Sequence, residues 1–509
     1  MKAADFNNLT GFGGVGTAKK TRGMLNAVSL FSGCGGLDLG FAMSGHFSIK
    51  FACDIDTVAA DTYAENFGAR KVKVLPDRQE SDPLFLLGDI QNLNFQRLLT
   101  LFPDTDVVIG GPPCQDFSVA RGTDRANAGI NTKRGRLYAY FVKVLISLQP
   151  KYFVFENVPG ITSDNKGSTW DIIREDFSNL SMHTEDIEEI VGDGFPDISS
   201  GYFLAYEGVA DASAVGVPQK RRRVVIVGVR RDLLKNCSAG SEDFLAQEIS
   251  KICRSKIEGR DLLFRSYPLS SMEVFEGKTI DALEKRYREL MKEWHSGEEN
   301  KRIPELVKWA DEDSEALKNG IAKNYCRANS SEFSNFNFRR AMEEHRRVLE
   351  LLGYKKIQVF DEREITDPSC AIPKESKKVV SRLYYTPPDE NYKFLYRYKQ
   401  WKVEGKNISM IYRRIHPLKP AYTITANGGG GTHGYHYERS RSRLTNRERA
   451  RLQSFPDSFK FSGIYGKQRE IIGNAVPPLL GKAVADAIFE TDMLLRGKAR
   501  NEDTELLLF

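Results

Sequence analysis

Apolar runs and helical patterns alternate along the first half of the chain. Short apolar runs of strand length recur between residues 27 and 229, separated by stretches with helical spacing. This alternation is typical of a doubly wound sheet built from βα units. The runs that predict strands are 27–31, 48–53, 84–87, 106–109, 152–155 and 224–229.

The pattern changes after residue 231. Acidic and basic residues alternate densely up to about residue 323, and 279–294 carries apolar residues at helical spacing. We therefore predict a helical insertion at about 241–323, whose apolar side chains serve packing. Those of 279–294 are Ile280, Leu283, Tyr287, Leu290, Met291 and Trp294.

Aromatic and basic residues interleave from 379 to 402, where Pro387 and Pro388 interrupt the pattern. Short strands and loops are predicted there. A further strand is predicted at 421–425, followed by the glycine run 428–431. Such a loop lets a backbone approach a phosphate closely, although a mobile hairpin is an equally good interpretation.

Composition indicates a soluble globular protein. The chain has 509 residues, of which 41% are hydrophobic and 28% charged, enough for two or three domains with their own cores. No apolar run has the length of a membrane span, and residues 1–20 lack the apolar core of a signal peptide. We therefore expect a cytoplasmic protein that does not bind a membrane.

Cysteine and histidine usage predicts neither disulfides nor a metal site. The seven cysteines are dispersed without a CxxC pair, which fits a reducing compartment. His433 and His436 form a close pair with no cysteine nearby, so an exposed loop is a better interpretation than a zinc site.

Positive charge is concentrated near the C-terminus. The net charge is only +6, from 74 basic and 68 acidic residues, but six arginines crowd a short stretch with few acids. Such clustering predicts contact with a nucleic-acid backbone, and the alternative is a solvated helix face. The arginines are Arg439, Arg441, Arg443, Arg447, Arg449 and Arg451.

Two consecutive predicted strands end in groups that carry chemistry. The strand at 106–109 leads through two glycines to Pro112-Pro113-Cys114-Gln115, and the strand at 152–155 ends in Glu156. Ligands gather at the carboxyl ends of parallel strands, so thiol and carboxyl can face one pocket. A thiol beside a proton-donating acid suits covalent attack on an electron-poor ring.

The earlier strand ends predict a site shaped for adenosine. A glycine turn, residues 32–36, follows the first strand, but Asp38 stands where a dinucleotide fingerprint needs glycine. Asp54 and Asp89 follow the next two strands, where acids hold ribose hydroxyls or an adenine amino group. Taken singly, each acid is more often a helix N-cap.

A basic segment leads into the strand at 224–229. Strand alternation places Arg221 and Arg223 on one face, so both can point toward the predicted pocket. The alternative is a nuclear-import patch, which a basic run entering a buried strand disfavours.

These motifs together resemble those of the DNA (cytosine-5)-methyltransferases, most closely the prokaryotic and phage enzymes of restriction-modification systems. The resemblance covers residues 28 to about 485, nearly the whole chain. It rests on FSGCGG at 31–36, PPCQDFS at 112–118, FENV at 155–158, QKRRR at 219–223, RERARLQSFP at 447–456 and GNAVPP at 473–478.

The resemblance implies a fold and a domain plan. A Rossmann-like, S-adenosylmethionine-dependent α/β domain would comprise 24–231 and a C-terminal segment, 466–509, after a flexible tail at 1–23. A mixed α+β target-recognition domain, 232–465, would be inserted between its two parts. DNA would lie in the cleft between the domains.

The resemblance also implies residue roles. Cys114 would be the nucleophile and Glu156 the acid at cytosine N3, with Arg221 and Arg223 holding the flipped ring. S-adenosylmethionine would contact Phe31, Ser32, Gly33, Cys34, Gly35, Gly36, Leu37, Asp54, Ile55, Asp89, Ile90, Pro112, Asn474 and Val476. DNA would contact Gln115, Ser118, Arg121, Arg134, Gln219, Thr423, Thr425, Arg441 and Arg443. The family often has an acid two residues before the loop arginine Arg134, and this chain has Thr132 there.

The implied activity is methyl transfer from S-adenosyl-L-methionine to C5 of a cytosine flipped out of duplex DNA, without a metal. The enzyme would act as a monomer, with a restriction endonuclease as a separate cognate partner. A tRNA cytosine-5 methyltransferase would use nearly the same catalytic residues, but the long aromatic and basic insert favours duplex DNA. A non-catalytic DNA-binding protein is disfavoured because every catalytic residue type is present.

Overall fold

The computed structural model describes residues 24–78, 83–113, 136–183, 190, 201–235, 240–296, 320–361, 367–403, 410–426, 432, 434–439 and 442–497. These residues form two compact units. The sheet unit comprises the described parts of Met1–Asp211, Arg222–Arg260 and Val476–Leu508, and the second unit those of Ala212–Arg221 and Asp261–Ala475. The predicted tail at 1–23 lies outside the described residues.

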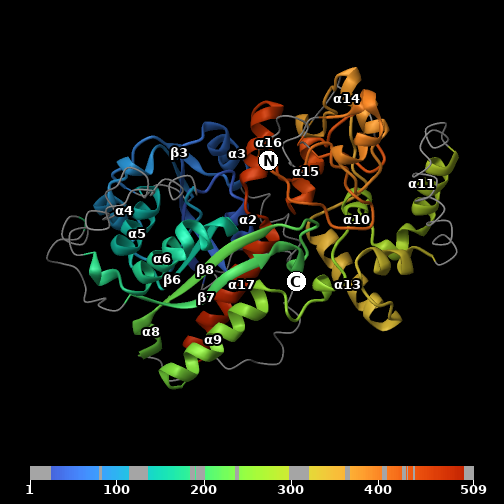
Figure 1. Ribbon diagram of the computed structural model, residues 1–509. Coiled ribbons are helices and arrows are strands. Elements are labelled where there is room, and N and C mark those ends of the chain that lie inside the picture. The colour runs from blue at the N-terminus through green and yellow to red at the C-terminus, as the bar shows by residue number, and fades with distance from the viewer. Residues whose placement is uncertain are drawn as a thin grey trace, which may run out of the picture. The chain divides into compact units, whose positions relative to one another are not determined.

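The described strands of the sheet unit form one eight-stranded sheet in the order β3-β4-β2-β1-β5-β6-β8-β7 (Figure 1). The strands from β3 to β6 pair in parallel, whereas β8 runs antiparallel to both β6 and β7. Their bounds are β1 Leu25–Leu30, β2 Phe47–Asp54, β3 Arg70–Val72, β4 Leu84–Leu87, β5 Val107–Gly110, β6 Tyr152–Asn157, β7 Tyr202–Asp211 and β8 Arg222–Arg230.

The predicted α/β class and all six predicted strands are confirmed. The apolar runs found them because the strands are covered on both faces and are therefore nearly continuously apolar. Two strands were missed. β3 is only three residues long, and the exposed Glu207 and the half-buried Gly208 interrupt the apolar run of β7.

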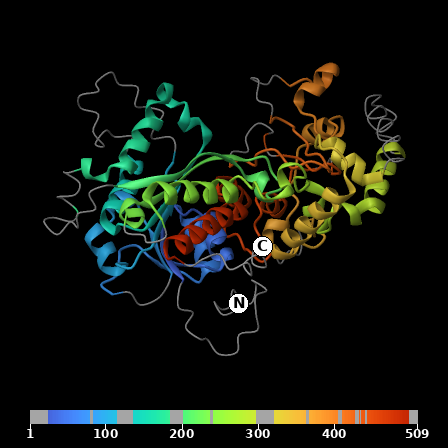
Figure 2. The same ribbon diagram turned by 90° about the horizontal axis from the view of Figure 1, so that it is seen from below.

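Helices cover both faces of the sheet (Figures 1 and 2). On one face, Phe141 of α5 and Phe177 of α6 pack edge-on or tilted against Phe153 and Phe155 of β6. On the other, the Tyr152 hydroxyl donates to Asp492 of α17 at 3.1 Å. The unit's helices are α2 Gly36–Ser44, α3 Thr57–Phe67, α4 Phe95–Leu101, α5 Arg136–Leu148, α6 Ser168–Ser178, α8 Arg231–Lys235, α9 Glu242–Ile257 and α17 Pro478–Leu495.

The C-terminal helix α17 is part of the core of the sheet unit. A β-carbon placed on Gly40 of α2 would lie 2.4 Å from the backbone of α17, so glycine lets the two helices cross with their backbones in contact. By length and composition alone, Tyr465–Leu495 is the one stretch among the described residues that could cross a membrane, but 67% of its most apolar window is buried. Its position beside α2 and α9 makes α17 a core helix.

Two predicted domain boundaries differ from the compact units. α9 was expected in the inserted domain, but it packs against α17, and Lys256 forms an ion pair with Glu490 at 2.7 Å. The sheet unit therefore continues to Arg260 rather than ending at residue 231. The segment from residue 466 divides at Ala475, because α16 packs within the second unit. The functions assigned to these domains stay predictions.

The second unit is mainly helical. The helix predicted at 279–294 is confirmed as a short 3-10 turn, Ile280–Leu283, followed by α11. The strands predicted within 379–402 are wrong: the chain there ends α14 and then forms 3-10 turns at Tyr392–Arg397 and Lys399–Trp401. The helices are α10 Ser271–Glu276, α11 Glu284–Ser296, α13 Asn335–Leu351, α14 Lys377–Tyr384, α15 Asn446–Leu452 and α16 Tyr465–Asn474.

The strand predicted at 421–425 is also wrong. Of residues 421–425, Ala421 is the only one that forms a β-bridge among the described residues, and its partner is Gln219. Residues 422–425 belong to no strand or helix. A strand needs a neighbouring backbone along its length, which an apolar pattern by itself does not supply.

Candidate active site

Four strand ends meet at one edge of the sheet. Leu30 at the end of β1 is in register with Cys53 of β2 and with Gly110 of β5, and Gly110 is in register with Phe155 of β6. The chain order reverses between β1 and β5, which places a topological switch point at this edge. Open α/β sheets bind ligands at such a point.

The glycine turn after β1 is held by Asp54. Phe31, Gly33 and Gly35 have positive φ, a conformation that favours glycine at the last two positions. The Asp54 carboxylate accepts hydrogen bonds from the backbone N–H of Gly33 at 2.8 Å and of Asp56 at 2.9 Å. Burial raises the pKa of Asp54 despite these donors. The end of β2 thus fixes the shape of the turn that follows β1.

The predicted cofactor residues divide into accessible and buried groups. Ile55 is 68% exposed, an unusual exposure for a large apolar side chain, and Phe31 and Asp89 are half-buried. Asp89 also caps a 3-10 turn by accepting from the N–H of Gln91 at 2.9 Å. The side chains of Cys34, Leu37 and Ile90 are buried in the core, so only their backbone could reach a ligand.

The segment that leads to Cys114 is fixed beside Glu156. The amide of Asn157 donates to the carbonyl of Pro112 at 3.0 Å and accepts from the N–H of Val158 at 2.8 Å. A β-carbon on Gly111 would lie 2.7 Å from a carboxyl oxygen of Glu156, so glycine is needed for this approach. The described chain ends at Pro113, one residue before the predicted nucleophile.

Glu156 is paired with Arg223. The Arg223 Nε lies 2.9 Å from a Glu156 carboxylate oxygen, and both side chains are only 13% exposed. Because β8 is antiparallel to β6, its first residues lie at the carboxyl edge of β6. That reversal of direction, which the sequence pattern did not predict, brings this arginine to the strand-end site.

Arg221 has different partners from Arg223. Its guanidinium is 1% exposed and donates to the carbonyls of Ile424, Gly473 and Ala475 at 2.9–3.0 Å. The predicted shared face is therefore corrected: Arg221 precedes β8 and belongs to the second unit, where it ties one segment to the end of α16. Its contacts are those of a structural residue.

Gln219 is likewise buried in the second unit. Its side-chain amide donates to the carbonyl of Leu452 at 2.9 Å and to Gln453, and its oxygen accepts from the N–H of Ile424 at 2.6 Å. With an exposed fraction of 0%, it has no surface to offer DNA. The predicted DNA contact of Gln219 is therefore corrected to a structural role.

Comparison with known proteins identifies the family. The family model described as C-5 cytosine-specific DNA methylase matches residues 25–490. The chain belongs to this family. It is 45% identical over 473 residues to the DNA (cytosine-5-)-methyltransferase M.ApeKI of Aeropyrum pernix, an alignment that covers 91% of this chain and 98% of the relative.

Two further relatives are type II methyltransferases. M.NgoFVII of Neisseria gonorrhoeae is 30% identical over 89% of this chain and 83% of its own length. M.BbvI of Brevibacillus brevis is 28% identical over 91% of this chain and 90% of its own length. The identification made from the motifs is confirmed, and the protein is a DNA (cytosine-5-)-methyltransferase of the prokaryotic type with the corresponding α/β fold.

Several predicted site residues lie outside the described residues. They are Cys114, Gln115, Ser118, Arg121, Arg134 and Arg441, together with the glycine run 428–431. Thr423 and Thr425 are half-buried, and the Thr423 hydroxyl donates to the carbonyl of Lys220 at 2.7 Å. Asn474 is exposed and Val476 half-buried. The roles of all these residues stay predictions.

The predicted cluster of DNA-binding arginines is corrected by burial. Arg447, Arg449 and Arg451 of α15 are at most 3% exposed, so their side chains lie in the interior of the second unit and do not form an exposed basic face. Arg447 pairs with Asp367 at 2.8 Å, and Arg451 pairs with Asp457 and donates to backbone carbonyls. The charges of Arg447 and Arg451 are neutralised inside the second unit.

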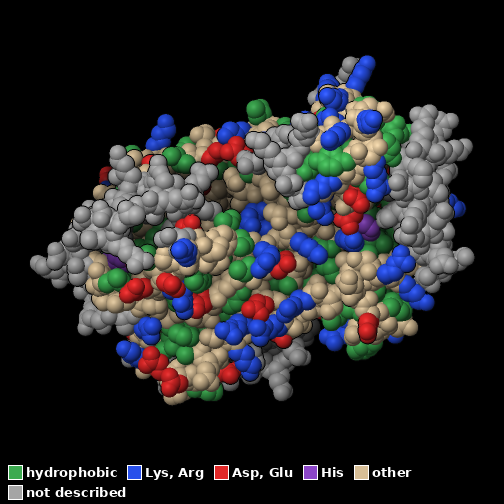
Figure 3. Space-filling model, viewed as in Figure 1, with side chains coloured by type: hydrophobic (Ala, Val, Ile, Leu, Met, Phe, Trp, Pro, Cys, Tyr) green, Lys and Arg blue, Asp and Glu red, His purple; other side chains and the backbone are tan. Residues whose placement is uncertain are grey.

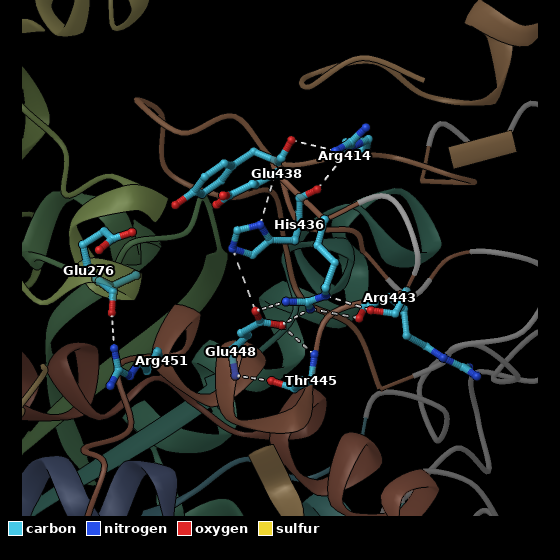
Figure 4. Close-up of polar contacts among 12 residues, drawn as sticks. Glu276, Arg414, His436, Glu438, Arg443, Thr445, Glu448 and Arg451 are labelled. Atoms are coloured by element: carbon cyan, nitrogen blue, oxygen red, sulfur yellow. Dashed lines mark hydrogen bonds and ion pairs between the residues drawn. The ribbon is translucent and has the colours of Figure 1, made fainter. Parts of the chain in front are cut away.

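Figure 4 shows the polar network around Glu448. Both Glu448 carboxylate oxygens accept from Arg439, at 2.9 and 2.7 Å, and one also accepts from the N–H of Thr445, which caps α15. Burial opposes the charged carboxylate, but Arg439 outweighs it, and the pKa of Glu448 is lowered to about 2. The arginine-rich stretch therefore builds a core.

Arg443 points away from this network in Figure 4. Its Nε lies 2.9 Å from Glu375, and the side chain is 21% exposed. An ion pair already satisfies part of this guanidinium, which weakens the prediction of a phosphate contact.

His436 is buried rather than exposed in a loop. Its ring stacks on Phe275 with centroids 5.1 Å apart, and its Nδ1 accepts from the N–H of Glu438 at 3.1 Å. Burial lowers the pKa of His436 to about 3, so the ring is neutral at pH 7. Within the described ranges, no group of three or more His, Cys, Asp or Glu side chains is arranged to hold a metal.

An exposed basic and aromatic surface lies around α14. Lys and Arg side chains gather over this helix in the space-filling view (Figure 3). Further along the chain, Arg397 and Lys399 are exposed, and the Arg397 guanidinium lies 4.5 Å from the ring centroid of Phe394. Their predicted role in base recognition stays a prediction.

Sequence reasoning assigned no role to Gly111 or Asn157. Both act on the segment before Cys114, one by permitting the approach of Glu156 and the other by holding Pro112. Gly111 directly follows β5 and Asn157 ends β6, and these positions at strand ends are the sequence feature that could have pointed to their roles.

Proposed function

We propose that this methyltransferase forms a covalent bond between Cys114 and C6 of a cytosine flipped out of duplex DNA, and methylates C5 of that base. The observation that carries the proposal is the Glu156–Arg223 pair, packed against Gly111 three residues before Cys114. A duplex hides C5 and C6 within its base stack, so extrusion of the target is needed.

The chain's own groups suit each proton and bond in this reaction. The Cys114 thiolate would add to C6 while Glu156 donates a proton to N3, which leaves C5 electron-rich. After C5 accepts the methyl group, transfer of the C5 proton to water would expel the Cys114 thiolate from C6, and N3 would return its proton to the Glu156 carboxylate, which restores the neutral aromatic ring. Arg223 would hold the Glu156 carboxyl group in place and contact the ring.

The residues at the strand ends fit S-adenosyl-L-methionine, which would supply an electrophilic methyl group on a sulfonium. The Gly33–Gly35 turn presents backbone at a strand end, and the exposed Ile55 offers an apolar surface for a flat adenine ring. Asp89 is accessible enough to accept from the adenine amino group. Asp54 would act chiefly by holding the turn, since both its oxygens accept from backbone N–H groups.

The names of the relatives support the setting that we propose. M.NgoFVII and M.BbvI are type II methyltransferases by name, and from this likeness we infer a monomeric cytoplasmic enzyme with a restriction endonuclease as a separate partner. We place base choice within 379–431, where Arg397 and Lys399 are exposed. Phosphate contacts position a protein and base contacts specify its target.

The test is methylation of duplex DNA by the wild type and by Cys114→Ser. Serine is far less ionised than a thiol at neutral pH, so methyl transfer should be lost while specific DNA binding survives. The wild type should also form a covalent adduct on duplex DNA that carries 5-fluorocytosine at the target, and Cys114→Ser should not. Retention of most of the rate by Cys114→Ser, or methylation of tRNA in preference to DNA, would contradict the proposal.

A further inference from the structure

Two arginines of the second unit lack the carboxylate partners that their neighbours have. Arg439, Arg443, Arg447 and Arg451 each form an ion pair, with Glu448, Glu375, Asp367 and Asp457 respectively. Among the described residues, neither Arg449 on α15 nor Arg469 on α16 forms one. Within the part of the chain that the structure describes, these two guanidinium groups therefore carry positive charge without a carboxylate partner.

Arg449 is a buried cation with unused donors. The residue is 1% exposed, and its Nε and one terminal nitrogen have no hydrogen-bond acceptor among the described residues. Burial lowers the pKa of Arg449, and the neighbouring positive charge of Arg469 acts in the same direction. A buried unpaired charge is costly, so its presence favours a function.

Arg469 is the accessible member of the pair. It is half-buried, and its Nε donates to the carbonyl of Ala426 at 3.1 Å. A β-carbon on Gly473 would lie 2.2–2.5 Å from the backbone of Thr425 and Ala426, so this segment lies directly against α16. The same segment carries Thr423 and Thr425, which the sequence predicted to contact DNA.

We propose that Arg469 and Arg449 form a subsite for one phosphate group of the DNA backbone. Arg469 contacts the phosphate through its terminal nitrogens, and Arg449 adds uncompensated charge from the interior behind it. A phosphate diester carries one negative charge and accepts from planar guanidinium groups. The subsite rests on the proposed function, because its position beside Thr423–Thr425 is what selects DNA over a free anion.

The decisive measurement is the salt dependence of binding to a non-specific duplex. Each phosphate contact contributes about 0.9 to the slope of log affinity against log salt concentration. Arg469→Gln should lower that slope by about 1 and weaken binding roughly tenfold at moderate salt, equally for all sequences. Arg346→Gln removes the same charge from an exposed position on α13 and should change neither quantity.

A second variant tests the buried charge of Arg449. Arg449→Met removes an uncompensated buried cation, so the melting temperature of the free protein should rise while DNA binding weakens. Inorganic phosphate should raise the melting temperature of the wild type more than that of Arg469→Gln. A fall in melting temperature for Arg449→Met would overturn its role as a free charge.

An unchanged salt slope in Arg469→Gln, with normal DNA methylation, would refute the subsite alone. At low salt and saturating DNA, Arg469→Gln should keep the wild-type kcat, because the phosphate contact serves binding. A wild type that binds DNA with the expected slope but transfers no methyl group to it would instead refute the proposed function.

Discussion

Arg223 and Glu156 form an ion pair of 2.9 Å across two antiparallel strands, β8 and β6. The Glu156 carboxyl group lies against Gly111, where an added β-carbon would be 2.7 Å from a carboxyl oxygen. This arrangement places a fixed carboxyl group beside the segment that delivers Cys114. It identifies Glu156 as the general acid to test first.

Glu156→Gln should lower kcat by roughly 10²–10⁴, the range for loss of general acid catalysis. The glutamine oxygen can still accept from Arg223, so the site should stay folded, and calorimetric affinity for S-adenosylmethionine should barely change. Glu207→Gln, which breaks the exposed Arg174–Glu207 pair on the edge strand, is the matched control and should keep full activity. A large loss of cofactor affinity with an unchanged rate in Glu156→Gln would assign this carboxyl to the wrong site.

Asp54→Ala should weaken S-adenosylmethionine binding and destabilise the protein. The variant leaves the N–H groups of Gly33 and Asp56 without their acceptor, and because both hydrogen bonds are part-buried the cost for each should be about 1 kcal/mol. Asp56→Ala removes the cap of α3 and should cost about 1 kcal/mol without affecting cofactor affinity. Equal cofactor affinities for both variants, measured by calorimetry, would exclude a role of the turn in binding.

Arg221→Lys should lower the free energy of unfolding more than it affects kcat. Lysine cannot reach the three carbonyls that the guanidinium joins, so unfolding should require at least ~3 kcal/mol less free energy. At low temperature, where the variant is folded, kcat should fall less than for Arg223→Lys. If Arg221→Lys melts like the wild type but has lost kcat, the residue contacts substrate as the sequence suggested.

The buried His345–Glu273 pair predicts a stability loss at high pH. Nδ1 lies 2.8 Å from a Glu273 carboxyl oxygen and Nε2 lies 2.8 Å from the carbonyl oxygen of Tyr267, an arrangement that suits a charged imidazolium donating to both. Burial opposes that charge, but Glu273 outweighs it and raises the pKa of His345 above its ordinary value.

The stabilisation should therefore be full below about pH 6.5, the pKa of an unfolded histidine, and be lost as pH rises through the raised folded value. Denaturant unfolding from pH 5.5 upward should show the wild type losing stability relative to His345→Gln. A constant difference between the two proteins across that range would mean that His345 does not titrate with folding.

Exchanging residues 379–431 with those of a relative of different specificity should transfer the DNA target. Single substitutions of Arg397 or Lys399 should relax it, at about 1–3 kcal/mol of discrimination for each lost base contact. Arg288→Gln, on α11 of the helical insertion, should leave the target unchanged. Methylome sequencing reads all three outcomes, and an active chimera with the original target would move recognition elsewhere.

Local pattern was enough to determine the elements and chemistry of the sheet unit. Six strands, the glycine turn and the strand-end acids follow from short-range sequence, because an apolar run and a turn need only their own residues. The order of the motifs along the chain, together with the reactive residues that they contain, was enough to identify the family. The sequence motifs predict both Glu156 and Arg223 as site residues. They do not predict that β8 runs antiparallel to β6.

Only the tertiary structure decided which charges are free. Arg447 meets Asp367 and Arg451 meets the carbonyl of Val274, partners far away in the chain, so their density in sequence indicated a surface where there is a core. The same folding placed Gln219 and Arg221 inside the second unit and left Arg469 half-exposed. Burial and pairing depend on residues brought together by the whole fold, and composition within a short window does not encode them.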